Sequence, residues 1–157
     1  MIDCLSIKIG MFGDTNVGKS TMLEVLRQQN TIIPNVYLTI GVDYMLKKYT
    51  HDDIIFRLQV WDTAGQEKFR SISESYFRGI NVPVFAFDLS DRSSFTSINR
   101  WISSYNNSRG SEPLFLILVG NKSDLERSVS EGEINKSVSD HGFCYYETNK
   151  DNLDSIN

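Results

Sequence analysis

The stretch Gly13-Asp14-Thr15-Asn16-Val17-Gly18-Lys19-Ser20 decides the fold of this chain. It fits the pattern G-x-x-x-x-G-K-[ST], in which a loop between a strand and a helix gathers backbone N–H groups into one concavity that binds phosphate. Gly13 and Gly18 allow tight turns and a close approach of the anion. Lys19 supplies a positive charge for phosphate oxygens, and the Ser20 hydroxyl is an oxygen ligand suited to Mg²⁺.

The flanking residues favour a phosphate-binding loop over an ordinary strand-to-helix turn that happens to contain glycines. Apolar residues typical of a buried strand precede it: Ile7, Ile9, Met11 and Phe12. Apolar residues at helical spacing follow it: Met22, Leu23, Val25 and Leu26. A strand, a glycine loop and a helix in this order are the context that the motif requires.

Composition indicates one globular domain. The chain has 157 residues, 40% of them hydrophobic, which is enough for a substantial core. Its formal net charge of −4 gives no support to nucleic-acid binding. Cys4 and Cys144 show neither metal-ligand spacing nor a disulfide framework. Without a signal peptide, a bilayer-spanning run or a lipidation site, the chain as given is expected in the cytoplasm and without a membrane anchor.

Strand and helix signals alternate along the chain, which predicts an α/β fold with a mainly parallel sheet covered on both faces. Residues 42–49 and 54–61 flank a polar turn and predict an antiparallel hairpin at the sheet edge. Unbroken apolar runs at 84–87 and 114–119 predict central strands. Trp61 falls on the polar side of its strand, where packing under a loop and presentation to a partner both stay open.

Two helices are predicted in the second half. One carries an apolar face and is capped by Asp91 or Ser93. That face consists of Phe95, Ile98, Trp101, Ile102 and Tyr105. A weaker helix is expected at about 131–140, followed by a short strand at Phe143–Glu147. Residues 29–38 are expected to form a loop.

The end of the strand at 54–61 carries the next chemical signal. Asp62 stands where a P-loop NTPase holds Mg²⁺, usually through water. Gly65 can bring a backbone N–H against a γ-phosphate, and the Gln66 amide can orient an attacking water. Alone, D-x-x-G also fits a loop that caps a helix. The phosphate loop makes the metal interpretation stronger.

The third signal, Asn121-Lys122-Ser123-Asp124, follows the apolar run at 114–119. The Asp124 carboxylate can accept from N1–H and the 2-amino group of guanine, and adenine lacks this donor pair. The Asn121 side chain can tie the base to the phosphate loop, and the Lys122 stem can lie along the ring. Alone, these residues fit a polar turn. Three such motifs, each after an apolar strand, predict a guanine-nucleotide site.

With these motifs, the sequence resembles the Ras superfamily of small GTPases, and the Rab branch in particular. Thr39-Ile40-Gly41-Val42-Asp43-Tyr44 resembles the Rab switch I segment. Residues 57–61, 68–73 and 76–80 resemble stretches that separate Rabs from other branches. The resemblance implies the P-loop three-layer α/β/α fold, with 1–157 as a single G domain that lacks the last family helix and the C-terminal tail.

The resemblance also implies roles for residues. Thr39 matches the threonine that coordinates Mg²⁺ and lends its N–H to the γ-phosphate. Tyr44, Trp61 and Tyr76 match an aromatic triad that Rabs present to effectors. Lys19 and Gln66 are the expected catalytic residues, and Ser20, Thr39 and Asp62 the expected metal ligands. The nucleotide is expected to contact Gly13, Asp14, Thr15, Asn16, Val17, Gly18, Lys19, Ser20, Thr21, Thr39, Gly65, Asn121, Lys122, Asp124, Thr148, Asn149 and Lys150.

The chain departs from the family pattern in two places. Tyr37 is the only aromatic between Asn30 and Thr39, so the residue that usually stacks on guanine is replaced by Ile32 or Ile33, and faster nucleotide release is expected. The family's E-T-S-A-K appears as Glu147-Thr148-Asn149-Lys150-Asp151. An ungapped alignment places Lys150 on the alanine whose N–H reads the guanine O6; a one-residue deletion keeps it as the lysine.

The expected function is a GTP-hydrolysing switch in vesicle trafficking that uses Mg²⁺. No arginine lies between Gln28 and Tyr44, so intrinsic turnover should be slow, about 10⁻⁴ to 10⁻² s⁻¹, and accelerated by a partner. Expected partners are an exchange factor, a GTPase-activating protein and effectors at 39–44, Trp61 and 65–76. A prenylated tail, if present in the native protein, would bring it to the cytosolic face of intracellular membranes.

Two other functions stay open. One is a nucleotide-binding interaction module with little or no hydrolysis, which the intact Gln66 disfavours. The other is an ATP-using P-loop kinase, which Asp124 and the lack of an arginine-rich lid disfavour. Single-turnover hydrolysis separates the first from a GTPase, and competition between GTP and ATP separates the second.

Overall fold

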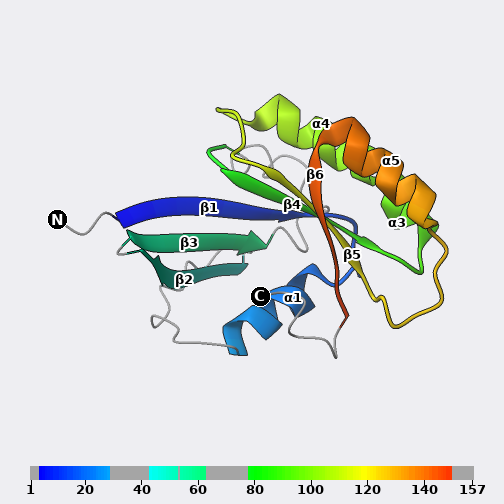
Figure 1. Cartoon of the computed structure of the whole chain (residues 1–157), viewed down its shortest axis with the longest axis horizontal. Coiled ribbons are helices and arrows are strands. Elements are labelled where there is room, and N and C mark those ends of the chain that lie inside the picture. Colours follow the sequence, from blue (N-terminus) through cyan, green and yellow to red (C-terminus); the bar gives the residue numbers. More distant parts are fainter. Residues whose placement is uncertain (1–3, 29–42, 53, 63–77, 150–157) are drawn as a thin grey trace.

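The computed structural model describes residues 4–28, 43–52, 54–62 and 78–149. Within these residues, strands and helices are interspersed along the chain, as Figure 1 shows. In chain order the elements are β1 (Cys4–Phe12), α1 (Lys19–Gln28), β2 (Asp43–His51), β3 (Ile54–Asp62), β4 (Val82–Asp88), α3 (Arg92–Thr96), α4 (Ile98–Ser108), β5 (Leu116–Asn121), α5 (Glu131–His141) and β6 (Phe143–Glu147).

The described strands form one sheet in the order β2-β3-β1-β4-β5-β6. β1 pairs in parallel with β3 and β4, and β5 pairs in parallel with β4 and β6. Only the pair of β2 and β3 is antiparallel among these strands, with a tight turn at Asp52, whose φ is 47°. The predicted parallel sheet with an antiparallel edge hairpin is therefore confirmed.

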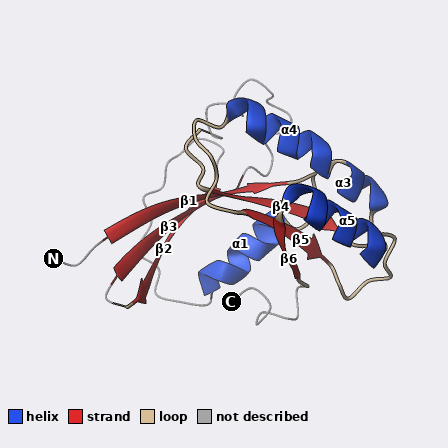
Figure 2. Cartoon of the chain, turned by 45° about the horizontal axis from the view of Figure 1, so that its top comes forward, coloured by secondary structure: helices blue, strands red, loops and turns tan. Residues whose placement is uncertain are grey.

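Helices cover both faces of the sheet. α1 lies on one face, and α3, α4 and α5 lie on the other (Figures 1 and 2). Strand alternation explains this arrangement, because successive side chains point to opposite faces. Met11 belongs to the cluster on the α1 side, whereas its neighbour Phe12 belongs to the cluster under α4.

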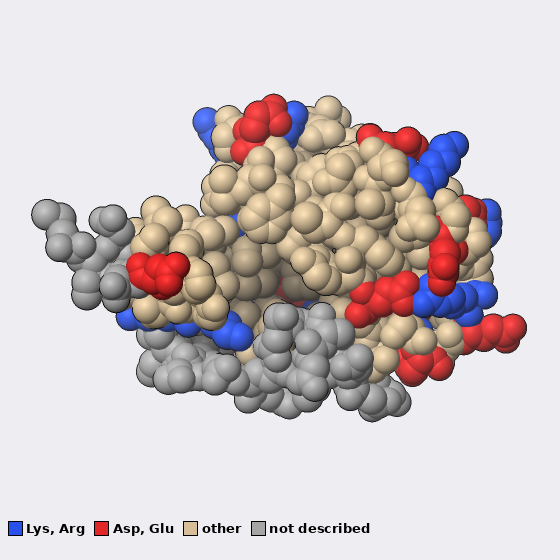
Figure 3. All heavy atoms as spheres, in the orientation of Figure 1, with Lys and Arg blue, Asp and Glu red and all other residues tan. Residues whose placement is uncertain are grey.

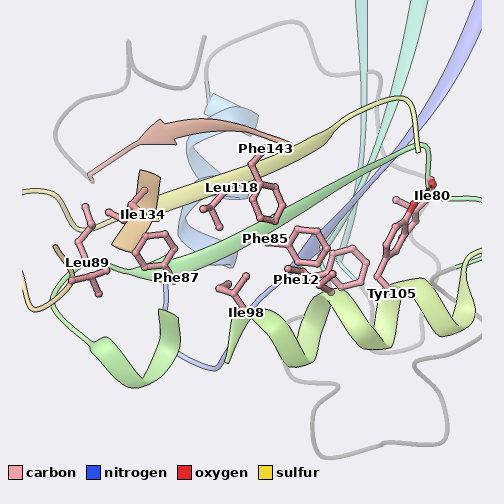
Figure 4. Close-up of a cluster of buried hydrophobic side chains, with 12 residues drawn as sticks. Phe12, Ile80, Phe85, Phe87, Leu89, Ile98, Tyr105, Leu118, Ile134 and Phe143 are labelled. Atoms are coloured by element: carbon pink, nitrogen blue, oxygen red, sulfur yellow. Dashed lines mark hydrogen bonds between the residues drawn. The ribbon is translucent and has the colours of Figure 1, made fainter. Parts of the chain in front are cut away.

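An aromatic group fills the core under α4 (Figure 4). The Phe12 ring centroid lies 5.4 Å from that of Phe85 and 5.7 Å from that of Tyr105. Phe143 of β6 approaches Phe85 edge-on at 5.7 Å. The Tyr105 hydroxyl is satisfied by a hydrogen bond to the Ile80 carbonyl at 3.1 Å. This core fixes β1, β4 and α4 relative to one another. It therefore also fixes the start of the loop that follows β1.

The helix predicted across the apolar face 95–105 is broken into α3 and α4 at Ser97, so the prediction of one helix was wrong. Asp91 caps α3 by accepting from the Ser93 N–H at 2.9 Å. The Thr96 and Ser97 hydroxyls donate to carbonyls four residues earlier, at 3.0 and 3.1 Å. Such back-bonding by serine and threonine competes with the regular ladder and bends helices.

The strand predicted at 114–119 begins later than expected. Leu114 and Phe115 are exposed and lie before β5, whose ladder with β6 starts at Leu116 and with β4 at Ile117. They precede the first pairs of both ladders, so the apolar pattern did not mark the strand start. The last elements follow prediction. Ser130 caps the N-terminus of α5 in a capping box with Glu133, and Gly142, whose φ is 71°, caps its C-terminus.

Candidate nucleotide-binding site

The candidate site lies at the carboxyl end of the parallel strands. Gly13 follows β1, and the last residues of β3, β4 and β5 are Asp62, Asp88 and Asn121. β1 is central because the chain builds β2 and β3 on one side of it and β4 to β6 on the other. In open α/β sheets, ligands bind outside the carboxyl ends of the strands at such a switch point.

The backbone of the phosphate loop requires its glycines. Gly13 and Gly18 have φ values of 146° and 100°, in the region that other residues rarely adopt. A Cβ on Gly13 would lie 2.2 Å from the Ala86 carbonyl oxygen, and one on Gly18 would lie 2.1 Å from the Asn121 Nδ2. Asn16 has a φ of 65°, which asparagine tolerates better than most residues. Both the backbone dihedral angles and the lack of space for a Cβ therefore require glycine at positions 13 and 18.

Lys19, the first residue of α1, is buried, and its ammonium is directed back over the loop. Its Nζ donates to the carbonyl oxygens of Gly13 and Asp14, both at 2.8 Å. Only 3% of the residue is exposed. A buried cation held by loop carbonyls at the start of a helix fits a phosphate-binding lysine.

The expected metal ligands from α1 and β3 are in contact. The Ser20 hydroxyl donates to Oδ2 of Asp62 at 2.7 Å, and Asp62 is buried. A hydroxyl and a carboxylate are the hard oxygen donors that Mg²⁺ accepts, usually together with water and phosphate oxygens. The donor set of these two residues therefore fits Mg²⁺.

Asn121 joins the base end of the site to the phosphate loop. Its Nδ2 donates to the Val17 carbonyl at 2.8 Å, and its Oδ1 accepts from the Thr148 hydroxyl at 2.9 Å. The Thr148 N–H donates to the Gly120 carbonyl, and the Ser123 N–H to the Thr148 carbonyl. One buried amide thus connects the loops after β1, β5 and β6.

Lys122 is held by Asp88, a residue that the sequence patterns did not single out. Lys122 has a φ of 60°, and its Nζ lies 2.5 Å from Oδ2 of Asp88. The Asp88 Oδ1 also accepts from the Ser90 N–H and hydroxyl, at 2.8 and 2.6 Å. Burial raises the pKa of Asp88, but the hydrogen bonds from Lys122 and Ser90 outweigh it and hold this pKa below its usual value.

A sequence signal for Asp88 did exist. It is an acidic residue directly after an apolar strand, the same relation that singled out Asp62. A carboxylate at that position also faces the loops of the site.

The remaining predicted contacts are distributed around these anchors. Thr15, Thr21 and Asp124 are exposed, whereas the Val17 side chain is buried on the α1 side of the sheet, so Val17 offers its backbone. Asn149 donates to the Ser123 hydroxyl at 3.0 Å. Thr39, Gly65, Gln66, Tyr76 and Lys150 lie outside the described residues.

The strand that leads to Thr148 and Asn149 is braced at Glu147. Arg127 forms an ion pair with Glu147, and the Tyr145 hydroxyl donates to Glu147 at 2.8 Å. Burial, followed by this bond, raises the pKa of Tyr145. The contacts of Glu147 with Arg127 and Tyr145 therefore fix the end of β6, from which Thr148 and Asn149 follow.

Trp61, expected in the aromatic triad, is partly buried near the end of β3. The ammonium of Lys8 on the neighbouring strand β1 lies 4.8 Å from its ring centroid, within cation–π range. Burial lowers the pKa of Lys8. The Trp61 ring is therefore packed against Lys8 and only partly buried, and its presentation to a partner stays a prediction.

On the face shown in Figure 3, charged side chains of both signs lie mainly around the margins, and the centre is largely uncharged. Two ion pairs involve α5 or the segment before it: Arg92 with Glu133, and Arg127 with Glu147.

None of the helices in the described ranges is both long and apolar enough to span a bilayer.

Comparison with known proteins gives consistent matches. A family model for the Ras family matches residues 8–157. The chain is 38% identical over 152 residues to the GTP-binding protein yptV2 of Volvox carteri, covering 94% of this chain and 69% of the relative. It is 36% identical over 152 residues to the Ras-related protein SEC4 of Saccharomyces cerevisiae (96% and 70%), and 38% over 140 residues to the Ras-related protein Rab-2B of Dictyostelium discoideum (88% and 68%).

Proposed function

Because the chain belongs to the Rab family of the Ras superfamily of small GTPases, we propose that it is a switch that binds GTP or GDP with Mg²⁺ and changes state when it hydrolyses GTP. Membership makes it a GTPase of the kind that works in membrane trafficking. In this role, residues 1–157 would act as one G domain that holds Mg²⁺, with the residue roles given below.

The Asn121 amide is the observation that carries this proposal. It bonds the Val17 carbonyl of the phosphate loop at 2.8 Å and the Thr148 hydroxyl at 2.9 Å. A phosphate loop alone serves many nucleotides. The bonds tie this loop to the segment that carries Lys122 and Asp124, so phosphate and base sites would be held at a fixed separation, and the Asp124 carboxylate would favour guanine over adenine.

The chain's own residues would divide the work as follows. Lys19 would neutralise charge that develops on the β–γ bridge and the γ-phosphate oxygens. Ser20 and Asp62 would hold Mg²⁺ together with Thr39, and bound Mg²⁺ supplies further charge neutralisation. Gln66 would orient the attacking water. Thr39 and Gly65 would be held through the γ-phosphate and released after hydrolysis.

Regulation would come from partners. With no arginine between Gln28 and Tyr44, the site would wait for one supplied in trans. Effectors would bind at 39–44, Trp61 and 65–76. The lack of an aromatic at the stacking position, where Ile32 or Ile33 stands, would speed nucleotide release. A dissociation rate as slow as that of typical Rabs would reject this part. A prenylated tail would place the switch at the cytosolic face of intracellular membranes.

Single-turnover hydrolysis tests the proposal. The chain is loaded with GTP, Mg²⁺ is added, and released phosphate is measured for the wild type, Gln66→Leu and Gln59→Leu. Gln59 is the matched control, because it lies within β3, before the strand end at Asp62, and its amide donates to the Ser6 hydroxyl of the neighbouring strand β1 at 2.9 Å. We expect slow hydrolysis by the wild type and Gln59→Leu, and a loss of about 100-fold in Gln66→Leu. A wild type that binds GTP but releases no phosphate would favour the interaction module.

A further inference from the structure

The carboxylate of Asp14, the second residue of the phosphate loop, is bound by helix α4. Its Oδ1 accepts from the Arg100 guanidinium and from the Trp101 indole N–H, both at 2.8 Å. These donors lie 86 and 87 residues further along the chain. α4 lies on the face of the sheet opposite α1 (Figures 1 and 2). The bonds therefore tie the loop that opens α1 to the opposite layer.

The backbone of the same residue contacts the phosphate-binding lysine. The Asp14 carbonyl accepts from the Lys19 ammonium at 2.8 Å. One residue thus bonds α4 through its side chain and Lys19 through its main chain. A rotation of the Asp14 peptide would move the carbonyl that positions the Lys19 ammonium. The hydrogen bonds from α4 to the Asp14 side chain therefore also affect the position of this ammonium.

The negative charge of Asp14 is unfavourable in a loop that binds phosphate, unless a cation compensates it. A carboxylate in a loop that receives the phosphate groups of a nucleotide would repel them. Arg100 supplies a compensating charge, and its guanidinium carbon lies 5.6 Å from the Trp101 ring centroid, which helps to orient it. The Asp14 side chain is 27% exposed and that of Arg100 is 64% exposed. The pair therefore lies at the surface, where an exchange of residues leaves the core intact.

We infer that Asp14 is a positioning residue, and that Arg100 and Trp101 of α4 hold its carboxylate away from the bound phosphates and its carbonyl on Lys19. This inference rests on the proposed function. It gives α4 a part in nucleotide affinity, with a stronger effect on the triphosphate than on the diphosphate because GTP carries more negative charge.

The test measures dissociation of fluorescent GDP and of a fluorescent non-hydrolysable GTP analogue from the Mg²⁺-loaded chain. The variants are Arg100→Gln, Trp101→Phe, Asp14→Asn, and Arg100→Gln combined with Asp14→Asn. Arg92→Gln on α3 is the matched control, because Arg92 pairs with Glu133. Thermal unfolding of each variant is recorded alongside.

Arg100→Gln should release the GTP analogue about fivefold faster and GDP about twofold faster, the scale of one uncompensated charge near the surface. Trp101→Phe, which keeps the ring but removes the donor, should shift both rates in the same direction. Asp14→Asn in the Arg100→Gln background should return both rates to near wild type, because the amide is neutral and can still accept from Trp101. Arg92→Gln should leave them unchanged.

Rescue by Asp14→Asn is the readout that a merely structural role of Arg100 would not produce. Equal acceleration for both nucleotides, no rescue, or an Arg100→Gln variant with wild-type rates would overturn the inference while the proposed function stands. A wild type that binds neither guanine nucleotide would overturn the proposed function, and the inference with it.

Discussion

The Ser20 hydroxyl donates a 2.7 Å hydrogen bond to the buried carboxylate of Asp62, which joins the first turn of α1 to the last residue of β3. The two residues are 42 positions apart in the chain. The parallel pairing of β1 with β3 brings them together, since Met11 and Asp62 are register partners. Two oxygens assigned to Mg²⁺ by motif are thus within reach of one ion.

Asp62→Asn should weaken Mg²⁺ binding while keeping the fold, because the amide oxygen can still accept from Ser20 but carries no charge. We expect the Mg²⁺ concentration that half-maximally slows GDP release to rise about 10- to 100-fold. Asp52→Asn in the exposed hairpin turn is the control, and it should leave this concentration unchanged. An Asp62→Asn variant with wild-type Mg²⁺ dependence would remove Asp62 from the metal site.

Gly18→Ala should destabilise the chain, since its φ is 100° and the new Cβ would meet Asn121 Nδ2 at 2.1 Å. We expect urea unfolding to show a loss of about 1–3 kcal/mol. Gly132→Ala in α5 is the control, because nothing lies within 4 Å of its added Cβ. That control should change stability by less than about 1 kcal/mol and in the stabilising direction. Equal effects at both positions would contradict the proposed crowding.

The lowered pKa of Asp88 predicts a specific acid dependence. Because the folded-state pKa lies below the unfolded value of about 3.9, the charged carboxylate stabilises the fold above that pH and this contribution is lost as the pH falls through the folded pKa. The free energy of unfolding of the wild type should therefore decrease when the pH is lowered past about 4. Asp88→Asn should show a shallower fall, and Asp140→Asn on the exposed side of α5 should follow the wild type.

Lys122 should respond to the same substitution. Asp88→Asn removes its charged partner, so GDP should dissociate faster at neutral pH, where the wild-type pair is intact. If the pair served the fold alone, the dissociation rate would stay constant while stability changed.

The bond from Asn149 to Ser123 predicts how this chain accommodates its altered base loop. Asn149 stands on the family serine in the ungapped alignment, and its amide donates to the Ser123 hydroxyl at 3.0 Å. Ser123→Ala and Asn149→Ala should each speed GDP release, by about 2- to 10-fold for the loss of one hydrogen bond. Their double variant should be no faster than the more affected single variant. Fully additive effects would show that the two side chains act separately.

Motif and periodicity predicted the parts of this structure that depend on local chemistry. The glycines of the phosphate loop follow from backbone geometry within a few residues, and the hairpin around Asp52 follows from two alternating runs and a polar turn. The position of Asn121 against the loop follows from the rule that parallel strands end at one edge. The Asn121 side chain donates to the Val17 carbonyl of the phosphate loop, a contact in line with the expected link between Asn121 and this loop.

Pairings between distant segments were beyond the sequence. Asp14 with Arg100, and Asp88 with Lys122, depend on how α4 and β5 lie against β1 and β4, which no local pattern encodes. The break at Ser97 was missed because serine back-bonding competes with a helix pattern that remains apolar throughout. Thr39, Gly65, Gln66 and Lys150 lie outside the described residues, so their roles stay predictions.

The nucleotide that remains on the protein after purification in Mg²⁺ tests the central claim most directly. It is released by denaturation, identified by mass and quantified per chain. The arrangement of Lys19, Ser20, Asp62 and Asn121 predicts GDP or GTP on most chains, restored by incubation with GTP if release is fast. An adenine nucleotide in its place, or a chain that takes up no guanine nucleotide at all, would contradict the account.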